Sequence, residues 1–180
     1  PLVEYYADVA EHVTVDVEAA NALMTEAGYS ESNPLPIRLI VVSSYPDWVS
    51  ACEVVKEMLE QSYFSVTIEQ VADTSRYTIQ DFDMAMLSVG LTTKFNSYAQ
   101  LYDDSTGLNQ SGIDDPDVQA AFAAMTDEAT TQAAMKAATE SRAYIPIYYP
   151  TTFFAFDANV NPGPYYTQFS AFMYRDFSWK

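Results

Sequence analysis

The stretch LPIRLIVVSSYPDWVSACEVVKEMLEQSYFSVTIEQV, residues 35–71, decides the fold. Its first part, Ile37 to Val42, is a nearly continuous apolar run with one charge, Arg38, which is typical of a strand covered on both faces. Pro46 fits the first position of a helix, because the nitrogen there needs no hydrogen-bond partner within the helix. The apolar positions of this helix fall on one face and are Trp48, Cys52, Val55 and Leu59.

After this helix the residues alternate between apolar and polar, which indicates a second strand. The apolar set is Phe64, Val66 and Ile68, and the polar set is Ser65, Thr67 and Glu69. A strand, a helix and a strand at this spacing predict a βαβ unit, in which the strands are parallel and the crossover is right-handed.

Further elements are predicted on both sides of this unit. Upstream, Asp16 can cap and Gly28 can end a helix whose apolar face is Ala20, Leu23, Met24 and Ala27. Downstream, Phe82 to Val89 has the composition of a third buried strand. Asp115 followed by Pro116 predicts the start of another helix, with an apolar face made of Val118, Ala121, Phe122 and Met125.

The C-terminal part is predicted to be helical first and irregular afterwards. Thr126 or Asp127 is the expected cap of an Ala-rich helix that reaches about Ser141. Residues 145–149 and 153–156 predict extended segments, and the proline between them favours a sheet edge or an interdomain crossing. From residue 159 on we expect an aromatic loop. The element order predicts an α/β fold with a mostly parallel central sheet flanked by helices.

Composition narrows the classes of partner. The 180 residues carry eight Lys plus Arg against 25 Asp plus Glu, a net charge of −17, while 49% of residues are apolar, which favours a folded chain. The charge argues against a nucleic-acid partner and disfavours anionic lipid surfaces. The single cysteine excludes an intramolecular disulfide and a cysteine-cluster metal site.

The chain begins at Pro1 without a targeting signal, so we expect a piece of a longer polypeptide.

Several segments, in this order, resemble the extracytoplasmic solute-binding proteins of ABC importers, in the class with oligopeptide-, dipeptide- and nickel-binding members. The segments are DVEAANALMTEAGY (16–29), the βαβ stretch (35–71), DFDMAML (81–87), NQSGIDDPDV (109–118) and AYIPIYYPTTFFAF (143–156). No segment is diagnostic alone, but their shared order over about residues 16–157 is specific.

The resemblance implies a two-lobed receptor that closes on a solute and presents it to a membrane permease. Residues 1–157 would be the second, ligand-binding lobe, and residues 158–180 would pack on the hinge or on the first lobe, which is absent here. The implied partners are a peptide or small-molecule solute, the first lobe and the ABC permease. The implied location is extracytoplasmic, in the periplasm or lipid-anchored at the outer face of the membrane. No cofactor, metal or catalysis is expected.

Candidate ligand-binding residues lie in loops that follow strands, because ligands of open α/β sheets bind at the carboxyl ends of the strands. The candidates are Ser44, Tyr45, Val89, Gly90, Thr92, Lys94, Asn96 and Asn109. The alternative for Ser44 and Tyr45 is that they cap the helix; Trp48 is expected in the core.

Val89 and Lys94 depart from the pattern of peptide-binding relatives, which the resemblance gives as a tryptophan followed by acidic residues. Lys94 would repel a free ammonium group and attract carboxylate, phosphate or hydroxyl groups. We therefore expect a capped peptide, a saccharide or another hydroxyl-rich or anionic solute. The alternative is that Lys94 pairs with a carboxylate on a very acidic surface.

Other polar groups have structural explanations. Asp81 and Asp83 are expected to make turn and strand-end hydrogen bonds, although a carboxylate pair is also what a secreted acidic glycan hydrolase would need. The acidic loop from Asp103 to Asn109 lacks the spacing of a calcium site. His12 is expected to be solvated, and Cys52 to be an inert buried thiol. The 14 tyrosines leave a protein-binding surface module as a third class.

Overall fold

The structure is a computed structural model that describes residues 15–88, 101–103, 109, 112, 114–148, 153–166 and 171–180. The chain divides into two compact units, and each is described by itself. The sheet unit comprises Ala10–Val89 with Asp104–Gly112, and the C-terminal unit comprises Pro1–Val9, Gly90–Asp103 and Ile113–Lys180.

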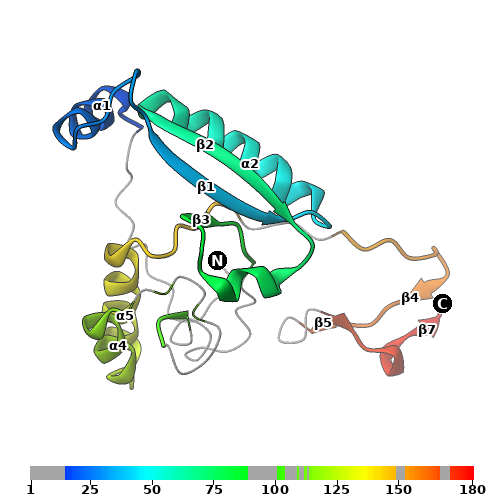
Figure 1. Ribbon diagram of the computed structural model, residues 1–180. Coiled ribbons are helices and arrows are strands. Elements are labelled where there is room, and N and C mark those ends of the chain that lie inside the picture. The colour runs from blue at the N-terminus through cyan, green and yellow to red at the C-terminus, as the bar shows by residue number, and fades with distance from the viewer. Residues whose placement is uncertain are drawn as a thin grey trace. The chain divides into compact units, whose positions relative to one another are not determined.

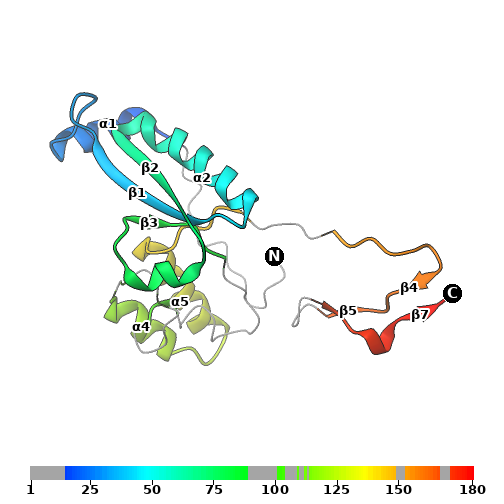
Figure 2. The same cartoon turned by 45° about the vertical axis from the view of Figure 1, so that its right-hand side comes forward.

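The predicted βαβ unit is confirmed in the sheet unit. Strand β1 (Leu35–Val42) is followed by helix α2 (Pro46–Leu59) and strand β2 (Phe64–Val71). The two strands are parallel and in register from Leu35↔Phe64 to Val42↔Val71. Strand β3 (Met84–Ala85) pairs with the other side of β1, so the strand order is β2-β1-β3. Figures 1 and 2 show α2 lying along the β1–β2 pair.

Strand β1 is covered on both faces, as its apolar run predicts. Leu39 and Val41 pack against Cys52 of α2, together with the partly buried Trp48. Ile40 and Val42 face the opposite way and pack with Tyr77. Tyr77 lies in a 3₁₀ helix, η2 (Thr74–Ile79), and it is fully buried. Two small cores therefore share one strand.

The third strand is much shorter than Phe82–Val89. The backbone N–H of Asp83 donates to the Arg38 carbonyl at 3.1 Å and that of Met86 to the Ile40 carbonyl at 3.0 Å, and side chains bond at the next positions. At one end the carboxylate of Asp83 accepts the backbone N–H of Arg38 at 2.7 Å, in place of a backbone carbonyl. At the other end the carbonyl of Met86 accepts the hydroxyl of Tyr77 at 2.6 Å. The expected strand-end role of Asp83 is confirmed, and Val89 lies outside the described residues.

Helix α1 (Val17–Glu26) has the predicted ends but not the predicted burial. The Asp16 side chain accepts the N–H of Ala19, and Gly28 has φ +92°, the left-handed region that favours glycine. No residue of α1 is buried among the described residues, and Leu23 of the predicted apolar face is 67% exposed.

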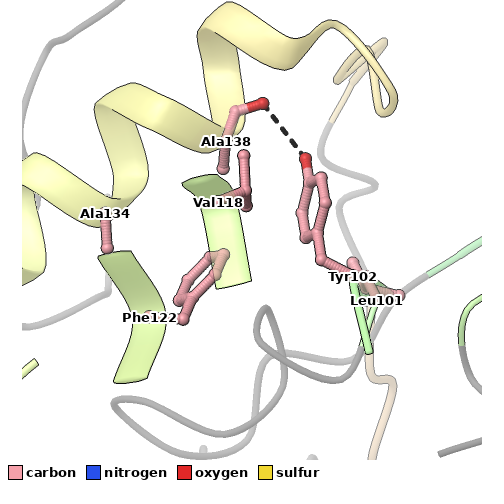
Figure 3. Packing of buried hydrophobic residues seen from close by; sticks show 6 residues of the cluster. All are labelled: Leu101, Tyr102, Val118, Phe122, Ala134 and Ala138. Atoms are coloured by element: carbon pink, nitrogen blue, oxygen red, sulfur yellow. Dashed lines mark hydrogen bonds between the residues drawn. The ribbon is translucent and has the colours of Figure 1, made fainter. Parts of the chain in front are cut away.

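The C-terminal unit begins with a helical pair. Helix α4 (Pro116–Ala123) is capped by Asp115, and helix α5 (Glu128–Ser141) is capped by Asp127, as predicted. Figure 3 shows their core: Leu101, Tyr102, Val118, Phe122, Ala134 and Ala138. The Tyr102 hydroxyl donates to the Ala138 carbonyl at 3.1 Å, and burial raises the pKa of this phenol.

The prediction of an irregular aromatic tail is wrong. Strand β4 (Val160–Asn161) pairs antiparallel with β7 (Ser178–Trp179), and β5 (Tyr165–Tyr166) pairs with β6 (Ala171–Phe172). A 3₁₀ turn, η4 (Tyr174–Asp176), precedes β7. Gly163 (φ +70°) links β4 to β5, and a Cβ there would lie 2.6 Å from the Cβ of Asp176. Aromatic residues favour paired strands, which explains the difference.

Rings from this tail and from the preceding segment gather in one cluster. The centroids of Phe156 and Phe172 are 5.0 Å apart, and those of Tyr165 and Phe172 are 5.2 Å apart. The segments predicted to be extended, residues 145–149 and 153–156, pair with no strand where the structure describes them, at residues 145–148 and 153–156. None of the helices in the described part of the chain has the length and apolar character needed to cross a bilayer.

Replacing Ile40 by alanine tests whether β1 is buried on both of its faces. Ile40 is fully buried, so Ile40→Ala should lower the free energy of unfolding by about 2–5 kcal/mol through lost burial and a residual cavity. Urea denaturation followed by circular dichroism gives the value. The control is Leu23→Ala on the exposed face of α1, where a change within about 0.5 kcal/mol is expected. Equal losses in the two variants would contradict the burial of β1.

Candidate functional site

The carboxyl end of β1 leads directly into the first candidate loop. The N–H of Ser43 donates to the Val71 carbonyl at 2.9 Å, which keeps the loop attached to β2. The N–H of Tyr45 then donates to the Val42 carbonyl at 3.2 Å and turns the chain towards α2. Ser44 and Tyr45 are both exposed. The loop is thus fixed by backbone bonds while its side chains face solvent.

Tyr45 occupies the N-cap position of α2 through its backbone only. Its carbonyl accepts the N–H groups of Trp48 at 3.0 Å and Val49 at 3.1 Å, and its side chain makes no capping bond. A side-chain cap by Tyr45 is therefore excluded as the explanation for this residue. The phenol is left available for another role.

The ring of Tyr45 stacks on the ring of Trp48. The ring centroids are 4.3 Å apart and the planes differ by 25°. Trp48 packs against the core beneath α2, which confirms its predicted place, whereas Tyr45 is 47% exposed. A partly buried indole therefore holds an exposed tyrosine ring at the strand end, in a geometry that aromatic pairs favour. Sequence reasoning identified both residues but missed their stacking.

Charge at this helix start limits what the loop can bind. A helix N-terminus favours anions, because its first N–H groups lack partners within the helix and the helix dipole is positive there. In α2 this position already has a carboxylate, that of Asp47 in the first turn. The N-terminus is consequently less attractive to an anionic solute than the amides and hydroxyls of the sequence alone indicate.

The second candidate loop lies outside the described residues. It contains Val89, Gly90, Thr92, Lys94 and Asn96, so their proposed contacts with a solute stay predictions.

Asn109 is described and lies in the sheet unit. It is buried, and its backbone carbonyl accepts the Nε2 of Gln80 at 3.5 Å. Gln80 follows η2 and has φ +53°. Its side chain contacts the backbone of Asn109 itself, and a contact between Asn109 and a solute remains a prediction.

The two aspartates considered for acid–base chemistry are engaged in structural contacts. Asp81 pairs with Arg76, which donates from Nη2 to Oδ2 at 2.9 Å, and with Arg38, whose Nη2 is 3.1 Å from Oδ1. Glu69 of β2 joins the same network, 3.4 Å from Nε of Arg38. The hydrogen bond from Arg76 is the main cause that lowers the pKa of Asp81. A general acid needs a raised pKa, so this network does not supply one.

Metal and thiol chemistry have no described site. No group of three or more His, Cys, Asp or Glu side chains among the described residues could hold a metal ion. Burial, reinforced by Glu53, raises the pKa of the Cys52 thiol to about 11, so this thiol stays protonated at neutral pH. His12 lies outside the described residues.

A parallel sheet with its exposed loop at the strand end is the architecture of a periplasmic-binding-protein-like lobe, and solved structures share it. NikA from Staphylococcus aureus in complex with Ni(L-His)2 aligns with a TM-score of 0.61 and 17% identity over 76% of this chain. OppA from Haemophilus influenzae in complex with the peptide RPPGFSPFR gives 0.60 and 19% over 71%. The murein tripeptide binding protein MppA from Escherichia coli gives 0.60 and 18% over 71%.

The family follows from the sequence. The profile of the bacterial extracellular solute-binding proteins, family 5 (middle region), matches residues 1–112, more than half of the 180 residues. The chain belongs to this family. A comparison with curated proteins gives no match. The chain spans 32% of the length of the NikA structure and 26% of the length of the OppA and MppA structures, so it corresponds to part of such a protein.

The Arg76–Asp81 pair makes a prediction about acid stability. Because the pKa of Asp81 is lower in the folded state than its usual 3.8, the ionised carboxylate stabilises the fold above that value. This contribution should disappear as the pH falls through the lowered pKa. In Asp81→Asn the deficit in unfolding free energy at pH 7 should therefore shrink below pH 3.8.

The measurement is urea denaturation at a series of pH values from neutral to acid, with Glu31→Gln as the control. Glu31 is an exposed carboxylate with no ion pair to the described residues. A deficit for Asp81→Asn that stays constant at all pH values would show that the network does not act through this charge.

Proposed function

We propose that the chain is the ligand-binding second lobe of a two-lobed receptor that captures a solute and delivers it to the permease of an ABC importer. Family membership supports the class of protein, and the partial span of its structural relatives supports a lobe rather than a whole receptor. The observation that carries the proposal is the exposed Tyr45 ring, stacked on Trp48 where β1 ends. This is the position at which open α/β sheets bind ligands.

The exposure of this loop supports a clamp. Ser44 and Tyr45 offer a ring face and hydroxyl groups to one side of a solute only. In a two-lobed receptor the remaining contacts form when the lobes meet, so the solute selects the closed state. Binding free energy then drives hinge closure rather than a chemical step. The proposed site of action is outside the cytoplasm, with the protein periplasmic or lipid-anchored.

The aromatic tail has a place in the same proposal. In this tail Tyr174 of η4 is 93% exposed and Trp179 of β7 is 79% exposed, and Phe153 before them is 89% exposed. Large apolar side chains gathered on one segment favour a covering partner. We assign residues 158–180 to packing on the hinge or on the first lobe.

The proposed solute is a peptide with a capped amino end, or a saccharide. At Tyr45 the favoured group is neutral and rich in hydroxyls, because a tyrosine ring stacks well on a sugar or side-chain face and Asp47 opposes a carboxylate. Lys94, if it contacts the solute, would attract a carboxylate or a hydroxyl group. A free ammonium group at Lys94 is disfavoured.

A thermal-shift screen of the full-length protein against peptides and oligosaccharides tests this function. A bound solute raises the melting midpoint by an amount that follows RT ln(1 + [L]/Kd). For the solute found, Tyr45→Ala should weaken binding by about tenfold, equivalent to about 1.4 kcal/mol, through loss of the stacked ring. Titration calorimetry measures the dissociation constant.

The matched control is Val54→Ala, which removes another exposed apolar side chain from α2, away from the helix start. Its dissociation constant should equal that of the wild type. Unchanged binding in Tyr45→Ala would exclude the loop from the site. Equal thermal shifts for the full-length protein and for this chain alone would refute the two-lobe clamp.

A further inference from the structure

Strand β2 forms one edge of the three-stranded sheet, and its register shows which backbone groups face outward. The N–H of Leu35 donates to the Tyr63 carbonyl, and the N–H of Ser43 donates to the Val71 carbonyl, each at 2.9 Å. Odd-numbered residues of β2 therefore bond to β1. In a parallel ladder the alternate residues point their N–H and C=O groups the other way, which here are Phe64, Val66, Ile68 and Gln70.

Both outward groups of Val66 are occupied by side chains from the last turn of α2 and from the residue that follows it. The N–H of Val66 donates to Oε1 of Glu60 at 3.2 Å. The carbonyl of Val66 accepts Nζ of Lys56 at 2.5 Å. Lys56 also donates to the same Oε1 of Glu60 at 2.5 Å, so the three residues form a closed set of hydrogen bonds.

This arrangement differs from an ordinary surface ion pair. An i,i+4 Lys–Glu pair on a helix contributes only about 0.3–0.5 kcal/mol. Here the two charged groups also fill the donor and the acceptor that an incoming strand would need at Val66, the third residue of β2. A strand arriving at this edge would have to displace Lys56 and Glu60 and leave both charges without these partners.

We propose that Lys56 and Glu60 form an edge lock: they close β2 at Val66 against pairing with the same strand of a second copy of this chain. The sequence of β2, FSVTIEQV, explains the need, since it is rich in β-branched and aromatic residues, has a single charge and contains no proline or glycine. Such an edge favours self-association when it is open. A second copy always brings an identical edge.

The test compares two double variants that remove the same groups. Lys56→Ala with Glu60→Ala opens the edge, whereas Lys136→Ala with Glu140→Ala removes the i,i+4 pair of α5, which is 3.8 Å apart. Those two side chains are 63% and 67% exposed, and both variants keep the net charge of −17. Sedimentation velocity over a range of concentrations should show at least about tenfold tighter self-association for the first variant only.

Two further measurements locate the effect at the edge. Adding Gln70→Pro to the opened variant should restore the wild-type association state, because proline removes an outward N–H without breaking a bond to β1. Amide exchange at Val66 should be faster in the opened variant than in the wild type. Should the double variant not fold, Lys56→Met frees the Val66 carbonyl alone and keeps the apolar stem.

The outcomes decide the proposal as follows. Association of the opened variant that proline at residue 70 abolishes supports the lock. A folded, opened variant with exchanging Val66 that self-associates no more than the control overturns it, because the net charge alone would then keep copies apart. Association that persists with Gln70→Pro also overturns it, since the contact would lie elsewhere.

Discussion

Strand β1 has to be apolar on both of its faces, and the sheet unit is organised around that requirement. Leu39 and Val41 meet α2 on one side, while Ile40 and Val42 meet Tyr77 on the other. A polar side chain at these positions would be buried without a partner. The polar groups that β1 brings are its own backbone, which bonds to the neighbouring strands and to Asp83, and the Arg38 side chain near its start, which forms ion pairs with Glu69 and Asp81.

The same requirement sets the place of the candidate site. Because both faces and both edges of β1 are used, the chain becomes accessible where the strand ends, at the Ser43–Tyr45 turn. The turn is held by two backbone bonds and by the stacking of Tyr45 on Trp48, whose other contacts lie in the core. The exposed ring is therefore positioned by the packing of β1 rather than by the loop itself, which suits a receptor surface that must be ready before its solute arrives.

Helix ends are determined by residues close to them in the sequence, and the sequence predicted these ends correctly. The caps at Asp16, Asp115 and Asp127 and the proline start of α2 lie where the sequence places them. The βαβ register follows from the apolar patterns. The short β3 was not predictable, because the hydrogen bonds at its ends involve the side chains of Asp83 and Tyr77, which are distant from β1 in sequence. The aromatic segment from residue 159 on was wrongly predicted to be irregular, because strands of two residues are too short to show an alternation of apolar and polar residues.

For the candidate site and for the edge of β2, the sequence predicted where the residues lie but not which contacts they make. Sequence reasoning could place Ser44 and Tyr45 at a strand end, but the stacking on Trp48 depends on a helical geometry three residues on. The i,i+4 spacing of Lys56 and Glu60 just before an apolar strand was a signal that could have pointed to the edge of β2. The sequence alone does not show the register of β2 against β1, and only this register shows that the backbone groups of Val66 face outward.

Amide hydrogen exchange along β1 measures most directly whether this strand holds the sheet unit together. If it does, the amides of Leu39 to Val42 exchange only through global unfolding, with an exchange free energy equal to that from denaturation, while the outward amides of Ile68 and Gln70 on β2 exchange through smaller openings. Exchange at Leu39 to Val42 that is as fast as at Ile68 and Gln70 would contradict the account.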